Sequence, residues 1–505
     1  MKKIIRRVFT ILPAVLLQLA WIYTLLQWLA PWAALLNLLL SIMALFFVLC
    51  IITKQDEGTY KILWLLVILT FPLPGAALYA FLGNRRTTKP LRKKLEATVI
   101  KPQKEDLNSA AAYGELSREN PRMAQLFRYI QNTTGFPVYA NEEAQYYPLG
   151  DELFPAMLDA LEKAERFIFV EYFIVKPGVM WDSMVEIMAR KAAQGVTVRV
   201  LYDDFGSIST YSGDNVRELW EKGIPCVPFN PLIFVKGTLN YRDHRKMLVV
   251  DGRTAFSGGV NLADEYINQD RRFGHWKDIG FRLTGPAVQN YTRMFAEFWN
   301  AFAAEPVPME LLTPPENHQR TGGRGYVVSY YDSPLRAQAV SNEVYIDLLS
   351  QARNYAYFFT PYLMPGEALL NAFVRAARRG VDVRILMPGI PDKKLVFRMS
   401  HSFYPVLLEA GVKIYEYTPG FVHAKGCVID GIAGTIGTVN LDYRSLFLHF
   451  ENNSLFYGAP VLQDLRDDFL TTQSRSREMR LGENVKVNFR HWMLDGILRI
   501  FAPLC

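Results

Sequence analysis

At 505 residues the chain is too long for one ordinary domain, and its length suggests about three structural units. Half of the residues are hydrophobic and the mean hydropathy is +0.04, values that are high for a soluble enzyme and indicate a membrane-embedded part. The net charge of +7 suits an anionic partner, either nucleic acid or anionic lipid. The four cysteines follow neither a disulfide framework nor a zinc-site spacing, which argues against both classes.

Three apolar segments open the chain, over Val8–Leu29, Ala33–Ile52 and Tyr60–Leu82. Each has about the 20 residues that a membrane-spanning helix requires, and the first is too long for a cleaved signal peptide. Basic clusters flank both ends of this region, and three full crossings would place them on opposite sides, against the positive-inside tendency. The run Pro72–Gly75 would kink the third segment or turn it back. We therefore expect two full crossings in a multi-pass cell-membrane protein, with the catalytic part in the cytoplasm.

The remaining boundaries follow from composition. A membrane anchor over residues 1–83 is followed by a polar, basic stretch over 84–135. We expect this stretch to be a juxtamembrane linker, either a helix near anionic head groups or a solvated tether. A Pro-rich, polar seam then separates a first catalytic half, residues 136–304, from a second half, residues 325–505.

Helical and strand patterns alternate in each catalytic half, and the alternation predicts an α/β fold. In the first half we expect helix, strand, helix and strand over Glu152–Glu165, Phe167–Phe173, Trp181–Gln194 and Val196–Tyr202. In the second half the same series is expected over Ala339–Ala352, Tyr355–Leu363, Ala368–Arg379 and Val381–Met387. A chain that repeats one series of elements in this way is an internal duplication.

A pattern His-x-Lys-x-x-x-x-Asp occurs once in each half, at positions 179 residues apart. Its residues are His244, Lys246 and Asp251 in the first half and His423, Lys425 and Asp430 in the second. The match between the two copies extends beyond the motif, because Asn261 and Asn440 each lie 17 residues after their histidine. The second copy has Gly437-Thr438 where the first has Gly258-Gly259.

The spacing suits phosphodiester chemistry. On a β-strand, side chains two residues apart share a face, so each His and Lys can point at one anion. A neutral His can attack phosphorus while a second His protonates the leaving alcohol. The two lysines, with Asn261 and Asn440, would hold the non-bridging oxygens. Asp251 and Asp430 complete the catalytic motif. Because side chains alternate along a strand, each aspartate would face the side opposite to its His and Lys, which favours a structural role.

A carboxylate stands at a matching position in each half, seven residues before a glycine: Asp278 before Gly285 and Glu451 before Gly458. Such a carboxylate could accept a hydrogen bond from Nδ1 of the histidine and so fix its tautomer. The alternative is a pair of surface carboxylates that align by chance. No metal or other cofactor is implied, because the carboxylates lack ligand spacing and lysine supplies the positive charge.

The paired motifs resemble those of the phospholipase D superfamily and, more narrowly, those of the bacterial cardiolipin synthases. Asn440–Ser445, Thr360–Tyr362 and the membrane stretch Trp64–Gly83 are similar to segments of the same family. The resemblance implies two pseudo-symmetric α/β/α halves that form one catalytic unit. It also implies a membrane-bound phosphatidyltransferase that makes cardiolipin and glycerol from two phosphatidylglycerol molecules. We expect His244 to form the phosphohistidine and His423 to act as acid and base, although the two roles could be exchanged.

Other functions remain open at this point. A membrane-anchored phospholipase D, or a phosphatidyltransferase that uses water, serine or ethanolamine, would carry the same motifs. A nuclease of the superfamily is disfavoured by the apolar segments, and a catalytically silent scaffold by the intact motifs, so we expect phosphatidylglycerol and an anionic bilayer as partners and no nucleic acid. His275, His401 and His449 have no Lys and Asn at the motif spacing, and we expect no catalytic role for them. Phe489–Phe501 is predicted to be an amphipathic helix that either docks on the bilayer interface or packs on the second half.

Overall fold

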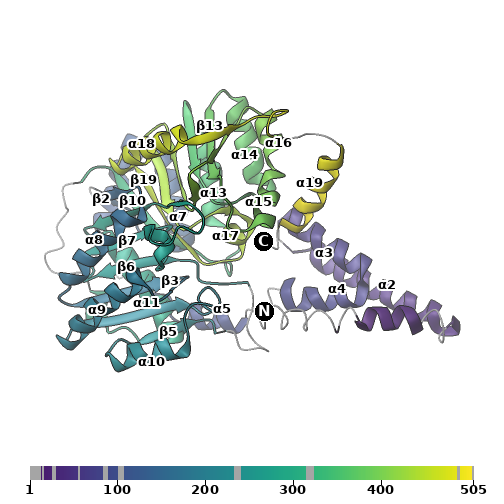
Figure 1. Cartoon of the computed structure of the whole chain (residues 1–505), viewed down its shortest axis with the longest axis horizontal. Helices are drawn as coiled ribbons and strands as arrows, with labels where there is room; N and C mark the ends of the chain where they lie inside the picture. Colours follow the sequence, from purple (N-terminus) through teal and green to yellow (C-terminus); the bar gives the residue numbers. More distant parts are fainter. Residues whose placement is uncertain are drawn as a thin grey trace. The chain divides into compact units, whose positions relative to one another are not determined.

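The computed structural model describes residues 13, 16–24, 30–54, 57–83, 89–100, 107–140, 142–231, 240–313, 323–485 and 489–502. The chain divides into two compact units (Figure 1). One contains residues 1–90 and 497–504, and the other contains residues 91–496 and Cys505.

The N-terminal unit is built from apolar helices. Its described elements are α2 (Ala30–Ile52), α3 (Gly58–Thr70), α4 (Pro72–Leu78) and the π-helical turn η1 (Tyr79–Gly83). Within the described residues, α2 is the one helix long and apolar enough to cross a membrane, over Ala34–Ile52. In the first expected segment, Val8–Leu29, residues 16–24 are described and are helical, while the rest of the segment apart from residue 13 lies outside the described residues. The structure therefore supports one candidate crossing where two were expected.

The third apolar segment is broken at its prolines, as its sequence predicts. Helix α3 ends at Thr70 and α4 begins at Pro72, whose missing N–H prevents α3 from continuing. Helix α4 then folds back against α3: a Cβ atom on Gly75 would lie 2.6 Å from the carbonyl oxygen of Val67. The segment is thus two short packed helices, and neither is long enough to span a bilayer.

The first half of the second unit is a seven-stranded mixed sheet in the order β2-β9-β7-β6-β3-β4-β5. Its strands are β2 (Glu143–Tyr147), β3 (Phe167–Tyr172), β4 (Thr197–Asp203), β5 (Cys226–Phe229), β6 (Lys246–Val250), β7 (Thr254–Gly258) and β9 (Gly280–Thr284). Its helices are α8 (Gly150–Glu162), α9 (Val179–Ala193), α10 (Gly213–Glu221), α11 (Val288–Phe302), α12 (Met309–Leu312) and the 3-10 helix η3 (Asp264–Ile267). Strands β3, β4 and β5 are parallel, and the strands from β6 to β2 pair antiparallel.

The second half repeats this design in a nine-stranded sheet, in the order β1-β10-β19-β17-β16-β11-β13-β14-β20. Its strands are β1 (Tyr139–Ala140), β10 (Tyr326–Asp332), β11 (Tyr355–Phe359), β13 (Asp382–Pro388), β14 (Lys413–Tyr417), β16 (Gly426–Ile429), β17 (Ala433–Gly437), β19 (Glu451–Tyr457) and β20 (Ser476–Met479). Its helices are α13 (Val340–Gln351), α14 (Glu367–Arg378), α15 (Lys394–His401), α16 (Tyr404–Glu409), α17 (Tyr443–Phe447) and α18 (Val461–Ser474). Helix α19 (Phe489–Phe501) begins in this unit, and its residues from Ile497 onward belong to the N-terminal unit. The run β9-β7-β6-β3-β4-β5 corresponds strand for strand to β19-β17-β16-β11-β13-β14, which confirms the duplication.

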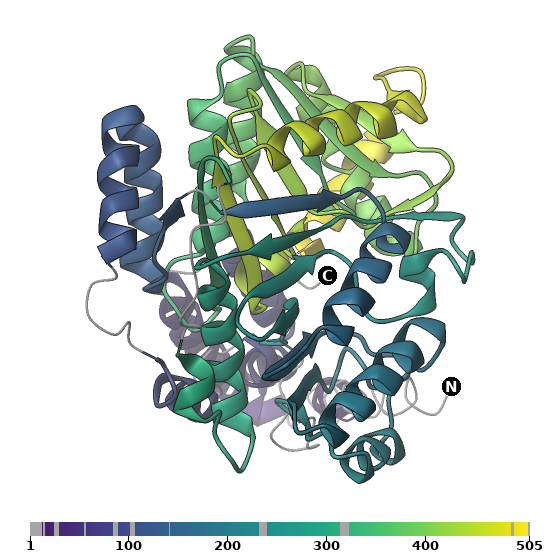
Figure 2. The same cartoon turned by 90° about the vertical axis from the view of Figure 1, so that its left-hand side faces the viewer.

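Two short parallel ladders lie outside these sheets. One pairs β12 (Leu363–Met364) with β18 (Leu441–Asp442), and the other pairs β8 (His275–Lys277) with β15 (Gly420–Val422). The second ladder joins the two halves, because β8 belongs to the first and β15 to the second. Helices α11 and α18 also hold the halves together: α11 contacts β6 and β10, and α18 contacts β16 and β2 (Figures 1 and 2).

The stretch expected to be a juxtamembrane linker contains helices that pack on the catalytic unit. Described residues there form α5 (Lys89–Glu96), α6 (Leu107–Glu119) and α7 (Pro121–Thr134). Helix α7 packs on β10 and α13, and the pair α6 and α7 stands beside the second half in Figure 2. The apolar side chains of α7 at helical spacing are buried in that contact: Met123, Leu126, Phe127 and Ile130. Residues 107–135 are therefore part of the catalytic unit, which begins before residue 136.

The expected helices and strands of both halves are present, with ends that differ by a few residues. The largest difference is the strand expected over Tyr355–Leu363, which ends at Phe359 and resumes as the separate β12. The terminal segment does form the expected helix, α19.

Candidate active site

Each motif histidine lies just before a buried strand. The expectation that His244 and His423 are themselves part of a strand with their lysines is wrong, because β6 begins at Lys246 and β16 at Gly426. Instead, each histidine is held by its backbone against the other half. The N–H of His244 donates to the carbonyl of Phe450 at 2.9 Å, and the N–H of His423 donates to the carbonyl of Lys277 at 2.7 Å.

These backbone contacts place each histidine beside a carboxylate of the opposite half. Nδ1 of His244 lies 2.9 Å from Oε2 of Glu451, and Nδ1 of His423 lies 2.7 Å from Oδ2 of Asp278. Where the carboxylate is ionised it can only accept a hydrogen bond, so Nδ1 carries the proton and Nε2 is left as the reactive atom. Burial raises the pKa of Glu451 well above its usual range, and Lys246, Ser445 and Thr438 oppose that shift. The structure thus brings the two expected carboxylates to the two histidines, in a crossed arrangement.

The two carboxylates are held differently. Glu451 also accepts hydrogen bonds from the hydroxyls of Thr438 and Ser445, at 2.5 and 2.7 Å. The position equivalent to Thr438 in the first half is Gly259, where a Cβ atom would lie 1.9 Å from Oδ1 of Asp278. A glycine at 259 is therefore required to let Asp278 reach His423, which accounts for the difference between Gly259 and Thr438.

The motif lysines are buried next to the histidines. Nζ of Lys246 donates to the carbonyl of His244 at 2.7 Å, and Nζ of Lys425 donates to the carbonyl of His423. Burial lowers the pKa of Lys246 to about 8 and that of Lys425 to about 7, while Glu451 and Asp278 oppose the shift.

The same environment keeps both histidines neutral. Burial, followed by the charge of Lys425, lowers the pKa of His423 to about 4. The pKa of His244 is also held well below its usual range, first by burial and then by Lys246 and Lys425. A neutral imidazole with a protonated Nδ1 is a nucleophile at Nε2.

The two motif asparagines are buried near the site. Oδ1 of Asn261 accepts from the N–H of Ile174 at 3.1 Å, and its Nδ2 donates to the hydroxyl of Tyr266 at 2.7 Å. Asn440 is buried beside Asp442. Asn261 therefore supports the loop after β3, and its expected contact with phosphate stays a prediction.

The motif aspartates lie at the far ends of β6 and β16, away from the lysines. Their backbone φ angles are +57° for Asp251 and +50° for Asp430, in the turns that follow the strands. Each side chain accepts three backbone hydrogen bonds at 2.7–2.9 Å, from Glu165, Arg166 and Phe167 for Asp251 and from Arg353, Asn354 and Tyr355 for Asp430. These contacts hold the starts of β3 and β11 and direct both carboxylates away from the motif lysines, which favours a structural role for Asp251 and Asp430 over a catalytic one.

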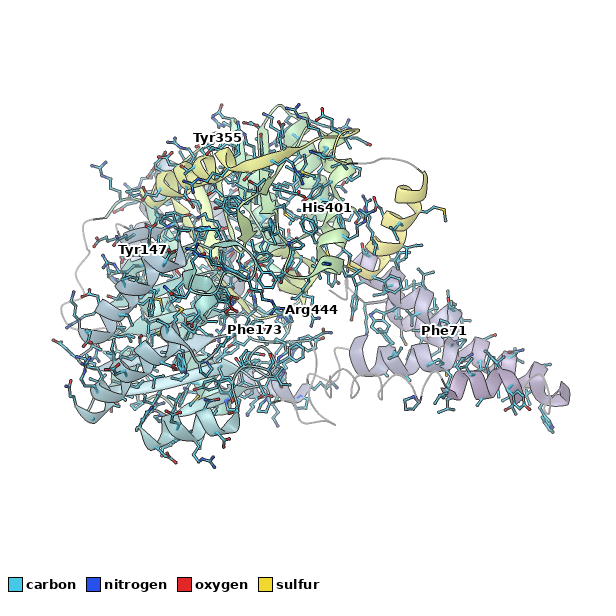
Figure 3. The ribbon with its side chains drawn as sticks, viewed as in Figure 1. Phe71, Tyr147, Phe173, Tyr355, His401 and Arg444 are labelled. Atoms are coloured by element: carbon cyan, nitrogen blue, oxygen red, sulfur yellow. The ribbon has the colours of Figure 1, made fainter. Side chains whose placement is uncertain are left out.

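Aromatic side chains wall the two histidines. The ring of Phe173 lies 4.8 Å from that of His244, and Tyr266, Trp276 and Phe421 lie 5.3, 5.5 and 6.0 Å from His423. Figure 3 marks Phe173, which follows β3. An apolar wall excludes water and strengthens the electrostatic contacts of a bound phosphate.

His449 belongs to this environment, although its sequence context gave no sign beyond its place two residues before Glu451. Its ring lies 6.4 Å from that of His244, and its Nε2 accepts a hydrogen bond from Nε of Arg444 at 3.3 Å. Burial and the neighbouring Arg444 keep the pKa of His449 well below its usual range. His275 and His401 lie elsewhere, against Tyr417 and Glu416.

Buried ion pairs on both sides of His244 fix its position further. The residues next to His423, Val422 and Ala424, are uncharged. Nε of Arg242 donates to both carboxylate oxygens of Asp203, at 3.0 and 3.1 Å. Arg245 is fully buried, pairs with Asp243 at 3.0 Å and packs on the ring of Phe298. Such pairs fix geometry more than they add stability, because both ions lose their hydration.

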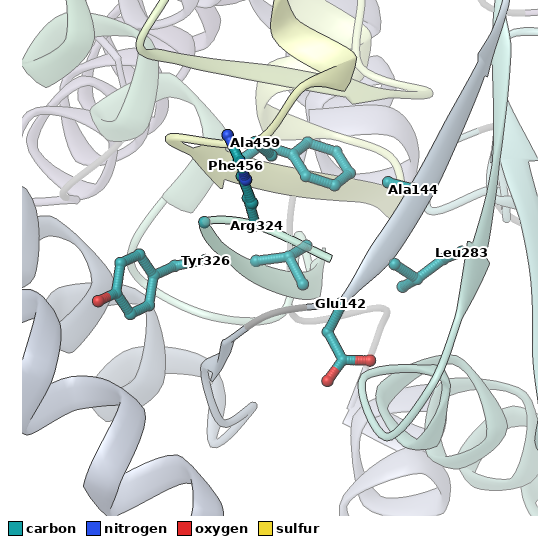
Figure 4. A pocket seen from close by; sticks show the side chains of 9 residues that line it. Glu142, Ala144, Leu283, Arg324, Tyr326, Phe456 and Ala459 are labelled. Atoms are coloured by element: carbon teal, nitrogen blue, oxygen red, sulfur yellow. The ribbon is translucent and has the colours of Figure 1, made fainter. Parts of the chain in front are cut away.

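Two surface pockets lie away from the histidines. One is a small, mostly apolar pocket where β2 and β9 of the first sheet meet β10 and β19 of the second (Figure 4). The other lies at the turn that contains Asp430 and Ile432. Within the described part of the chain, no group of three or more His, Cys, Asp or Glu side chains is arranged to hold a metal ion.

Comparisons with known proteins agree with this architecture. Residues 157–299 and 345–472 match the family model described as "Cardiolipin synthase, PLD-like domain", and residues 39–84 match "Phospholipase_D-nuclease N-terminal". A cardiolipin synthase of Geobacillus sp. (strain WCH70) is 36% identical, over 89% of this chain and 92% of its own length. A protein of Streptococcus mutans without an assigned function is 42% identical, over 90% of this chain and 99% of its own length.

The fold is also that of a solved structure. The phosphatidylserine synthase of Haemophilus influenzae Rd KW20 is similar with a TM-score of 0.56 and 15% identity, over 75% of this chain and 97% of its own. At that identity the likeness concerns the two-half α/β fold alone. From the family match over both halves and the long alignments with its members, the chain belongs to the cardiolipin synthase family with phospholipase D-like domains and is a phosphatidyltransferase.

Proposed function

We propose that this protein transfers a phosphatidyl group from one phosphatidylglycerol molecule to another, forming cardiolipin and glycerol through a phosphohistidine intermediate. The observation that carries the proposal is the crossed pair of histidines, each hydrogen-bonded at Nδ1 to a carboxylate of the other half. Each therefore presents Nε2, and a two-step exchange needs one such atom to attack and another to transfer a proton. Relatives over about nine-tenths of the chain carry the name cardiolipin synthase.

In the first step, Nε2 of His244 attacks phosphorus and the bond from phosphorus to the glycerol oxygen breaks. His423 donates a proton to that oxygen, and glycerol leaves. In the second step, His423 removes the proton from a hydroxyl group of a second phosphatidylglycerol. That oxygen attacks phosphorus, the phosphorus–nitrogen bond breaks and His244 is regenerated. The pseudo-symmetry of the halves allows the two roles to be exchanged.

The lysines would supply the positive charge for this chemistry. Lys246 and Lys425 are proposed to hold the non-bridging oxygens, where negative charge increases in the transition state. A bound phosphodiester anion would in turn raise the pKa of both lysines and of the acid histidine, because it opposes the charges that lower them. Substrate binding would thus give His423 the proton that the first step requires.

We further propose that the protein acts in the cell membrane, with the catalytic part on the cytoplasmic side. The N-terminal apolar helices would form the anchor, and the duplicated α/β unit would carry the site. A diacylated lipid cannot leave a bilayer without exposing its chains to water, so an anchored enzyme meets it where it resides. The candidate span Ala34–Ile52 and the family match over residues 39–84 support the anchor.

The acceptor is the point to test. Purified protein in detergent is given phosphatidylglycerol alone and then phosphatidylglycerol with serine, ethanolamine or excess glycerol, and the lipids are separated by mass. We expect cardiolipin and glycerol from phosphatidylglycerol alone, and reversal of the reaction by excess glycerol. Phosphatidic acid as the main product would assign a phospholipase D. Phosphatidylserine or phosphatidylethanolamine would assign a different acceptor.

A further inference from the structure

The segment from Ile390 to Arg398, which leads from β13 into α15, combines exposed apolar and basic side chains. Ile390 is 39% exposed and Leu395 is 59% exposed. Lys393 and Lys394 are exposed between them. Basic side chains next to exposed apolar ones are typical of a surface that contacts anionic lipid, where the apolar groups enter the head-group boundary and the lysines meet phosphates.

This segment is joined to the aromatic wall around His423. The hydroxyl of Tyr362 donates to Oδ2 of Asp392 at 2.6 Å, and Nζ of Lys393 lies 5.6 Å from the centre of the same ring. The ring of Tyr362 lies 6.5 Å from that of Phe421, which is 6.0 Å from the ring of His423. A continuous aromatic path therefore connects the segment with the site.

The backbone fixes the segment in this place. The N–H of Ile390 donates to the carbonyl of Gly420 at 3.1 Å, at the start of the strand β15 that leads into His423. A Cβ atom on Gly274 would lie 3.1 Å from Cδ1 of Ile390, so that side chain rests against the approach to β8. The position of the segment relative to His423 is thus set by the same ladder that orients the histidine.

The surface continues onto the C-terminal helix. Arg398 of α15 pairs with Asp495 of α19 at 2.6 Å. Immediately before Asp495 in α19, Met493 and Leu494 are 48% and 44% exposed. The ion pair neutralises Asp495, and Nζ of Lys393 lies 3.9 Å from Oδ2 of Asp392, so Lys394 adds a further positive charge to this surface.

We propose that these side chains form a docking surface that rests on an anionic bilayer beside the His423 end of the site. The docking surface consists of Ile390, Lys393, Lys394, Leu395, Met493 and Leu494. Lipid would reach the site from the contacted leaflet, along the wall formed by Tyr362 and Phe421. The proposal rests on the membrane-bound lipid substrate proposed above, but its first test does not require activity.

The direct test measures contact with lipid. The full-length protein carries Cys50→Ser and Cys505→Ser, and an environment-sensitive fluorophore is attached at Leu395→Cys. It is reconstituted in vesicles of phosphatidylglycerol and phosphatidylcholine. Ile432→Cys is the matched control, because Ile432 is 46% exposed at the opposite end of β16. We expect lipids with brominated acyl chains to quench the probe at 395 and not that at 432. Equal quenching at both sites, or none at 395, would overturn the docking surface.

A second test measures the consequence for turnover. Lys393→Glu with Lys394→Glu is compared with Arg217→Glu and Lys222→Glu, an equal charge change at exposed residues of α10 and of its C-terminal cap. We expect the first pair to raise the mole fraction of phosphatidylglycerol at half-maximal rate about tenfold or more, with kcat kept. Equal effects of both pairs would contradict the proposal. Quenching at 395 in a protein that makes no cardiolipin would contradict the proposed function and leave the docking surface standing.

Discussion

Nδ1 of His244 lies 2.9 Å from a carboxylate oxygen of Glu451, a residue 207 positions later that belongs to the other half of the molecule. The converse pair, His423 and Asp278, has the same geometry at 2.7 Å. Neither half therefore holds a complete site. The crossed pairs explain why the chain needs two copies of its motif in one folded unit.

The crossed carboxylates should matter for turnover more than for binding. In Asp278→Asn and Glu451→Gln, an amide can donate to Nδ1 and so select the tautomer with its proton on Nε2. We expect kcat to fall by about 10²–10⁴-fold with little change in KM, because a histidine in the wrong tautomer cannot attack or accept a proton. Steady-state kinetics on phosphatidylglycerol vesicles checks this.

The control for that experiment is Asp468→Asn. Asp468 pairs with Lys277 at 2.7 Å between the halves and contacts neither motif histidine. A fall in kcat for Asp468→Asn as large as that for Asp278→Asn, at equal thermal stability, would mean that the carboxylates act through the interface and not through the tautomer.

Gly259 should tolerate no side chain. A Cβ atom there would collide with Oδ1 of Asp278, so Gly259→Ala must displace the carboxylate from His423. We expect a loss of about 10²-fold or more in kcat, since a shift of about 1 Å in a catalytic group has that effect. Gly114→Ala, in helix α6 with open space around it, is the control and should keep full activity. An active Gly259→Ala enzyme would argue against the bracing role of Asp278.

Asp251 and Asp430 should affect stability and not chemistry. Each accepts three backbone hydrogen bonds at the start of a core strand. We expect Asp251→Ala and Asp430→Ala to lower the free energy of unfolding by about 2–4 kcal/mol, seen as a lower Tm, while the folded fraction keeps its kcat. A large fall in kcat at unchanged Tm would restore them to the catalytic set.

The pH profile should report the lysines at its alkaline side. In the free enzyme the pKa of Lys425 is about 7 and that of Lys246 about 8, and each lysine is charged only below its pKa. We therefore expect kcat/KM to fall as pH rises through 7–8. The corresponding fall in kcat should come at higher pH, because the bound phosphodiester raises both pKa values.

Arginine at these positions separates charge from titration. In Lys425→Arg the guanidinium stays charged throughout the range, so the alkaline fall that belongs to Lys425 should disappear, whatever the level of activity. If the fall persists unchanged in Lys425→Arg and in Lys246→Arg, another group is responsible for it.

Much of the site could be predicted, because the two halves repeat the same residues at the same spacing. His244 and His423 with their lysines, and the matched positions of Asp278 and Glu451, follow from comparing the two halves. The crossed pairing could not be predicted, because a sequence that repeats itself does not say whether a histidine meets the carboxylate of its own half. That choice depends on the contacts of β8 with β15 and of Asp243 with Phe450, which are made only in the folded state.

Other differences have identifiable causes. The packing of α7 on the second half was not predicted, because the polar, basic composition of residues 84–135 favours a linker or a helix near head groups. The stripe Met123, Leu126, Phe127 and Ile130 has helical spacing and indicates a buried face. His449 could not be found in this way, since its approach to His244 depends on the short helix α17 that turns the chain back before β19.

Both histidines should be needed to make cardiolipin from phosphatidylglycerol. The most direct measurement incubates wild type, His244→Ala and His423→Ala with phosphatidylglycerol without added metal, and then analyses both lipids and protein by mass. We expect cardiolipin and glycerol from wild type alone. We also expect a phosphatidyl adduct on the nucleophilic histidine when the variant that lacks the other histidine is given a donor with a good leaving group. Cardiolipin at the wild-type rate from either variant would contradict the need for both histidines.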